Sequence, residues 1–171
     1  MSDTDNAKEM FQKAMHDFMS QNYESSIESF TRAIDADPEL KLAILSRGSA
    51  YFKLDRIEEA RRDFDTVVKI DPNSARAFHL RGLVRDKAGD QRAALADFDK
   101  AVALDPAYGA AYYSRANLHA KMGSTDLATE DIQMATHLTE VNIEQFANEN
   151  NVWRSQQLRV EEMGGADPMV R

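Results

Sequence analysis

The 171-residue sequence contains no cysteine, which excludes disulfide bonds, thiol catalysis and thiolate metal sites. Glycine and proline are scarce, with 7 and 4 residues, which suits a mostly helical protein. No apolar run approaches the roughly 18 residues that a membrane-spanning helix needs, so we expect no membrane insertion. The opening "MSDTDNAKEM" is polar and acidic and does not resemble a secretory signal. We therefore expect a cytoplasmic protein.

The net charge is negative, at −8, and 43% of the residues are hydrophobic. An acidic chain is repelled by phosphate backbones and anionic membranes, so we expect no nucleic-acid partner. The length allows one domain or one short solenoid with a real core.

One ten-residue pattern occurs three times at a constant interval: "SFTRAIDADP" at 29–38, "DFDTVVKIDP" at 63–72 and "DFDKAVALDP" at 97–106. Alignment on the prolines divides the chain into segments 7–40, 41–74, 75–108 and 109–142, the last with Glu140 in place of proline. Within a segment, apolar residues recur at spacings of three and four, which predicts two helices with a break near Asp55. Each Asp-Pro pair should end the second helix.

Small residues recur at equivalent positions of the predicted helices. Gly48 and Gly82 lie in the middle of first helices, where glycine costs about 1 kcal/mol relative to alanine. This cost suggests that a neighbouring helix passes too close for a side chain. Large partners recur on the second helices: Phe30, Phe64, Phe98 and Ile132.

These small, aromatic and Asp-Pro positions resemble the tetratricopeptide repeat family over residues 7–142. The resemblance implies an all-α fold, a right-handed superhelical solenoid of four helix-turn-helix hairpins. Residues 143–163 continue the pattern and predict a C-terminal capping helix, because solenoids need a polar end. Residues 1–6 and 164–171 are expected to be flexible tails.

Two charged positions also repeat, which predicts three ion pairs within hairpins: Arg47–Asp63, Arg81–Asp97 and Arg115–Asp131. Such pairs can be bidentate and fix the register of two helices. The alternative is that the three arginines form an anion-binding row.

In the resembled family, first helices line a concave groove, and the residues following the core positions face it. The predicted groove residues are Phe11, Met15, Phe18, Met19, Leu45, Ser49, Phe52, Lys53, Arg76, His79, Leu83, Lys87, Tyr113, Asn117 and Lys121. The groove would be rich in apolar side chains at the N-terminal end and basic along the rest, which suits contact with a peptide. Alternatively, lysine is simply common at this position, and Phe11 and Met15 pack against a neighbouring helix.

We expect a non-catalytic scaffold that binds a peptide or short helix with acidic and apolar residues, as a monomer or weak homo-oligomer. A type III secretion-type chaperone for a translocator segment and a self-assembling scaffold are the alternatives. Some relatives bind the tails of heat-shock chaperones through a lysine and asparagine clamp. Its positions here hold Phe11, Met15 and Ser49, which argues against that role.

No sequence motif for catalysis or for a cofactor is present. The sequence lacks a P-loop, a dinucleotide-binding glycine motif and a His-Glu-x-x-His motif. The four histidines lie in different segments without metal-ligand spacing. We expect no enzyme activity, no cofactor and no metal.

Overall fold

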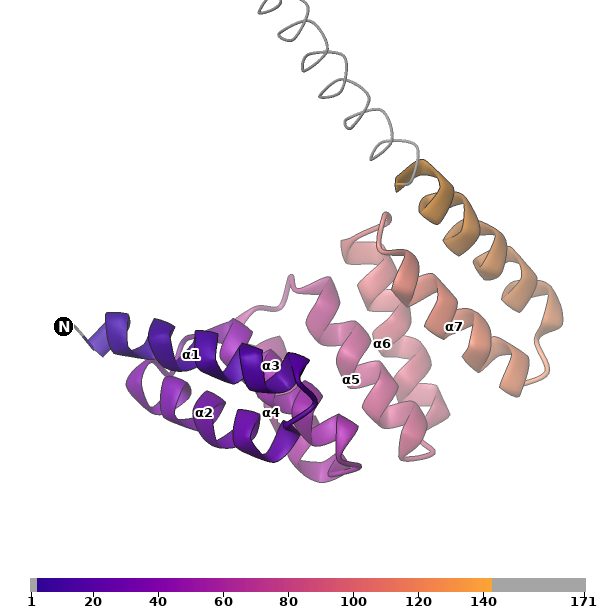
Figure 1. Ribbon diagram of the computed structural model, residues 1–171. Coiled ribbons are helices and arrows are strands. Elements are labelled where there is room, and N and C mark those ends of the chain that lie inside the picture. Colours follow the sequence, from indigo (N-terminus) through magenta and orange to yellow (C-terminus); the bar gives the residue numbers. More distant parts are fainter. Residues whose placement is uncertain (1–2, 143–171) are drawn as a thin grey trace, which may run out of the picture.

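The computed structural model describes residues 3–142, and every regular element within them is an α-helix (Figure 1). The labelled helices are α1 (Asp3–Met19), α2 (Tyr23–Ala36), α3 (Lys41–Lys53), α4 (Ile57–Ile70), α5 (Ala75–Lys87), α6 (Gln91–Leu104) and α7 (Gly109–Lys121). A further helix begins at residue 125 and reaches residue 142, where the description ends. Residues 3–6, predicted as a tail, form the first turn of α1. The predicted helix 143–163 and tail 164–171 lie outside the described residues.

The Asp-Pro pairs end the even helices as predicted. Asp37, Asp71 and Asp105 follow the last residues of α2, α4 and α6. Each carboxylate accepts a hydrogen bond from the backbone N–H two residues later, at 3.1, 3.2 and 3.0 Å. Aspartate therefore forms the turn and proline prevents the helix from continuing.

The turn inside each hairpin has the same backbone conformation in all four repeats. Gln21, Asp55, Gly89 and Gly123 occupy equivalent positions of successive repeats, and all four have positive φ, at 62°, 62°, 87° and 80°. This left-handed conformation closes a helix and suits glycine, whereas other residues adopt it at a cost. The repeat period in the sequence is thus a repeat of backbone geometry.

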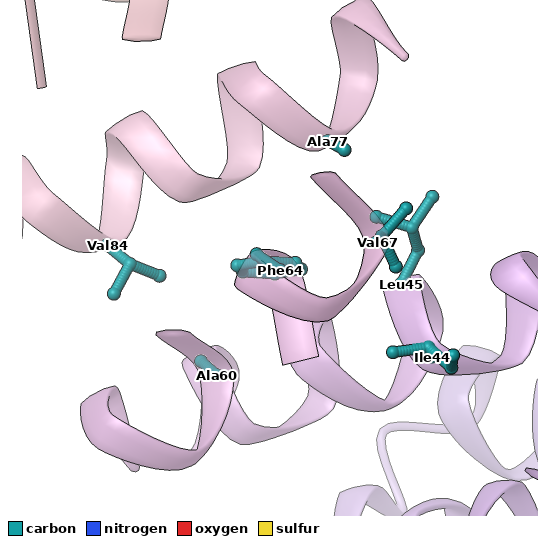
Figure 2. Packing of buried hydrophobic residues seen from close by; sticks show 7 residues of the cluster. All are labelled: Ile44, Leu45, Ala60, Phe64, Val67, Ala77 and Val84. Atoms are coloured by element: carbon teal, nitrogen blue, oxygen red, sulfur yellow. The ribbon is translucent and has the colours of Figure 1, made fainter. Parts of the chain in front are cut away.

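Each hairpin packs on the next through its even helix. Figure 2 shows one buried cluster in which α3 contributes Ile44 and Leu45, α4 contributes Phe64, and α5 contributes Val84. Phe64 and Val84 are almost inaccessible to solvent. Separate buried clusters of this kind join each hairpin to the next, and the predicted all-α solenoid of helical hairpins is confirmed.

The mid-helix glycines lie against aromatic rings of the paired even helices. A Cβ atom added at Gly48 would lie 2.7 Å from Phe64 Cε1, and one at Gly82 would lie 2.5 Å from Phe98 Cε1. Both distances are far below van der Waals contact. The glycines thus let α3 and α5 approach α4 and α6 closely.

The odd helices lie on the inside of the curve. Cα atoms approach within 8 Å between α1 and α3, between α3 and α5, and between α5 and α7. Within the labelled helices, no such approach joins α2 to α4 or α4 to α6. Stacked hairpins whose odd helices are closer together than their even helices must curve toward the odd side. We call the solvent-facing side of α1, α3, α5 and α7 the inner face.

Candidate functional site

The inner face carries exposed apolar side chains from three of its helices. Met19 of α1 is 78% exposed, Leu42 of α3 is 54% exposed and Tyr113 of α7 is 57% exposed. Such large apolar side chains are more often buried, so these three, spread along the inner face, are candidate contact points for a partner.

Most of the predicted groove residues are at least partly accessible. The exposed ones are Met19, Lys53, Arg76, Lys87, Tyr113, Asn117 and Lys121, and the half-buried ones are Phe11, Met15, Phe18, Ser49, Phe52 and Leu83. The Phe11 and Met15 side chains also pack against the buried cluster around Phe30. These two residues therefore belong to the hairpin core as well as to the inner face.

The structure corrects the prediction at two positions. Leu45 is 5% exposed and lies in the core cluster with Phe64. His79 is 7% exposed. Neither side chain is accessible to a partner, because the next hairpin covers the part of each helix from which it projects.

His79 instead joins the third hairpin to the fourth. Its Nδ1 is 3.0 Å from the Tyr108 hydroxyl oxygen, and its Nε2 is 2.9 Å from Ser114 Oγ. Burial, with a smaller contribution from Arg76, lowers the pKa of His79 from 6.5 to about 4. The imidazole is therefore neutral at pH 7, with one nitrogen donating and the other accepting.

A shallow depression lies on the inner face between α5 and α7. Its lining includes Leu83 and Asp86 from α5 and Tyr113, Asn117 and Lys121 from α7. Apolar, amide and charged groups thus converge there.

Two of the inner-face lysines are paired with acids. Lys87 Nζ lies 2.5 Å from Asp55 Oδ1, and Lys121 Nζ lies 2.6 Å from Asp86 Oδ2. Each bridge joins successive hairpins. Lys87 Nζ also lies 5.3 Å from the centroid of the Phe52 ring. The inner face is therefore less basic than the lysine positions alone suggest.

The three predicted Arg–Asp pairs are present and bidentate. The arginine Nη2 atoms lie 2.7 Å from Asp63, Asp97 and Asp131, and the Nε atoms also donate to these carboxylates. The three aspartates are 6%, 3% and 6% exposed. Because buried carboxylates already engage two donors of each guanidinium, the arginines are structural and do not form an anion-binding row.

Each of these arginines also reaches back to the preceding hairpin. Arg81 Nη1 lies 3.1 Å from Asp65, and Arg115 Nη1 lies 2.7 Å from Asp99. At the equivalent position, Arg47 Nη1 donates to the Thr31 hydroxyl at 3.1 Å. Each arginine therefore connects three helices.

Sequence reasoning missed these third partners, although Thr31, Asp65 and Asp99 also occupy equivalent positions of successive repeats. It also missed the role of Asp55 as the partner of Lys87, because Asp55 belongs to the hairpin turn and not to a helix.

The described residues provide no metal site and no membrane span. Within residues 3–142 no group of three or more histidine, aspartate or glutamate side chains could hold a metal ion. None of the described helices is both long and apolar enough to cross a bilayer.

Two family models match overlapping parts of the chain. One, described as "TPR repeat", matches residues 48–89, and the other, described as "Tetratricopeptide repeat", matches residues 79–139. Together they cover more than half of the 171 residues. The chain is a tetratricopeptide repeat protein. No curated protein matches it significantly.

Solved tetratricopeptide repeat structures share the fold. MamA has a TM-score of 0.73 at 22% identity, over 81% of each chain. The first tetratricopeptide domain of Spaghetti (RPAP3), bound to the HSP90 peptide SRMEEVD, has a TM-score of 0.67 at 23% identity, over 70% of this chain and 95% of that one. The Arabidopsis OM64 domain has a TM-score of 0.67 at 21% identity, over 70% and 98%. At these identities the likeness establishes the fold.

Proposed function

We propose that this protein is a non-catalytic scaffold that binds a peptide or short helix of a protein partner on its inner face. The observation that carries the proposal is the exposure of Met19, Leu42 and Tyr113 on the helices that form the inside of the curve. A curved row of four helices offers one continuous surface to an extended chain. A few apolar anchors with a polar surround supply most of the affinity in such interfaces.

The similarity to RPAP3 supports this mode of binding, because that domain was solved with a peptide bound. That peptide, SRMEEVD, is acidic at its end. In this chain, the positions of the lysine and asparagine clamp hold Phe11, Met15 and Ser49. We therefore propose the same general mode of binding, with a different peptide sequence.

A selection from a random peptide display library tests the proposal. Enriched peptides are synthesised with a fluorescent label, and their affinity is measured by fluorescence anisotropy. We expect Leu42→Asp and Tyr113→Asp each to weaken binding at least about tenfold, since each puts a charge where an apolar anchor docks. Ile70→Asp on α4 is the matched control, because Ile70 is 43% exposed but lies on an even helix.

Circular dichroism checks that all three variants keep their helical content, as substitutions of exposed residues should. The proposal fails if no peptide is enriched over beads without protein. It also fails if the enriched peptides bind the two inner-face variants as well as they bind the wild type.

A further inference from the structure

The last turns of α3, α5 and α7 carry lysines at equivalent positions, namely Lys53, Lys87 and Lys121. Lys87 is held by Asp55, the turn residue of the second hairpin, and Lys121 is held by Asp86, which lies on α5. Each acid comes from the hairpin that precedes its lysine. Two of the three positive charges are therefore neutralised within the protein.

Lys53 lacks both kinds of partner. In the first hairpin, the position equivalent to Asp55 holds Gln21, which has the same backbone conformation but no charge. The position equivalent to Asp86 holds Phe18. Lys53 is exposed and makes no ion pair with any residue that the structure describes. The first hairpin thus supplies an amide and an aromatic ring, whereas the second and third hairpins each supply one carboxylate.

The residue before Lys53 and the residue at its equivalent position on α1 are both apolar. The equivalent position on α1 is Met19, which is 78% exposed, and α1 contacts α3 directly. Phe52 precedes Lys53 and is half-buried. A lysine beside exposed apolar side chains can attract a carboxylate while its neighbours bury an adjacent apolar group.

The wider charge balance of the inner face favours the same ligand. Lys8 and Arg76 are also exposed and have no ion-pair partner within the described residues. The chain as a whole has a charge of −8, so this positive surface is a local reversal. A local reversal of charge steers oppositely charged partners toward one face.

We propose that Lys53 binds a carboxylate of the partner peptide, and that the apolar residue beside this carboxylate in the peptide packs against Met19 and Phe52. This inference rests on the proposed function and specifies its ligand: a segment in which glutamate or aspartate adjoins a bulky apolar residue. Lys87 and Lys121 contribute less, because a peptide carboxylate there competes with Asp55 and Asp86.

The test is a double-mutant cycle on the labelled peptides enriched by wild-type protein. Each acidic residue of a peptide is changed to its amide, and affinity is measured for wild type and for Lys53→Gln. We expect the change to amide at one position to weaken binding to wild type about fivefold and to have almost no effect on Lys53→Gln. Lys69→Gln is the control, because Lys69 is also an exposed lysine in a last helical turn but lies on the even helix α4, and this variant should respond to the amide peptide as the wild type does.

Each outcome is informative about this proposal. Enriched peptides without acidic residues overturn the Lys53 assignment and leave peptide binding intact. The same holds if the change to amide weakens binding equally for wild type and Lys53→Gln. A failure of the proposed function differs from both, because no peptide then depends on Leu42 or Tyr113. The charge effect should also shrink at high salt, as an exposed ion pair is screened.

Discussion

Replacement of Gly82 by alanine tests how closely the two helices of a hairpin approach each other. The change has two opposed effects. Alanine in place of a mid-helix glycine stabilises a helix by about 1 kcal/mol. Against this, the new Cβ would lie 2.5 Å from Cε1 and 2.7 Å from Cδ1 of Phe98. The Phe98 ring is fully buried and cannot move away without disturbing its neighbours in the core.

Overpacking of this kind costs about 1–3 kcal/mol. We therefore expect Gly82→Ala to lower the free energy of unfolding by about 1 kcal/mol after the helix propensity is subtracted. Gly109→Ala is the control, because a Cβ there meets only ordinary contacts, the nearest at 3.7 Å. We expect it to raise stability by about 0.5 kcal/mol.

Urea unfolding followed by circular dichroism measures both changes. The fourth hairpin supplies a compensating pair, since it has Ala116 and Ile132 where the third has Gly82 and Phe98. The double variant Gly82→Ala with Phe98→Ile should lose less stability than the two single changes added together. A gain of stability in Gly82→Ala alone, or strict additivity in the double variant, would refute the close approach.

Three further predictions concern the ion pairs and the buried histidine, and urea unfolding measures each of them. Arg47→Ala should lower the free energy of unfolding by about 3 kcal/mol, because it leaves the buried Asp63 unpaired. The control Lys41→Ala breaks an exposed bridge and should cost at most about 1 kcal/mol. Equal losses in the two variants would contradict the structural role of Arg47. The pKa of His79 is lowered from 6.5 to about 4 in the folded protein, so on acidification the unfolded chain takes up the proton first. The free energy of unfolding should therefore fall by up to about 3 kcal/mol as the pH drops from 6.5 to 4. His79→Gln should lose less stability than wild type over that range, and an identical pH dependence would argue against a neutral buried imidazole. Thr31→Asp should raise the free energy of unfolding by about 0.5 kcal/mol, because it gives Arg47 the second carboxylate that Arg81 and Arg115 already have. A loss of stability would contradict the equivalence of residue 31 with Asp65 and Asp99.

The repeat architecture could be predicted from the sequence because its determinants are local and periodic. The Asp-Pro pairs fix where the even helices end, and the constant repeat period fixes which residues share a position. The Arg–Asp pairs followed from the symmetry of an antiparallel hairpin, in which residues equally far from the turn lie side by side. Arg47 and Asp63 are such a pair.

The contacts between hairpins were harder to predict, since they depend on how one hairpin is rotated relative to the next. His79 was assigned to the groove because its position on α5 matches that of Leu45 on α3 and of Tyr113 on α7. Tyr108, at the start of the next hairpin, covers it. For the same reason nothing in the repeat pattern indicated that Asp55 would hold Lys87, because that pair joins a turn to a helix of the following hairpin.

Backbone amide chemical shifts of the isotopically labelled protein, recorded with and without an enriched peptide, test the central claim most directly. We predict that the amides that shift lie on α1, α3, α5 and α7, with the largest changes near Leu42, Lys53 and Tyr113. Shifts concentrated on α2, α4 and α6 would place the binding surface on the opposite side of the solenoid and contradict the account.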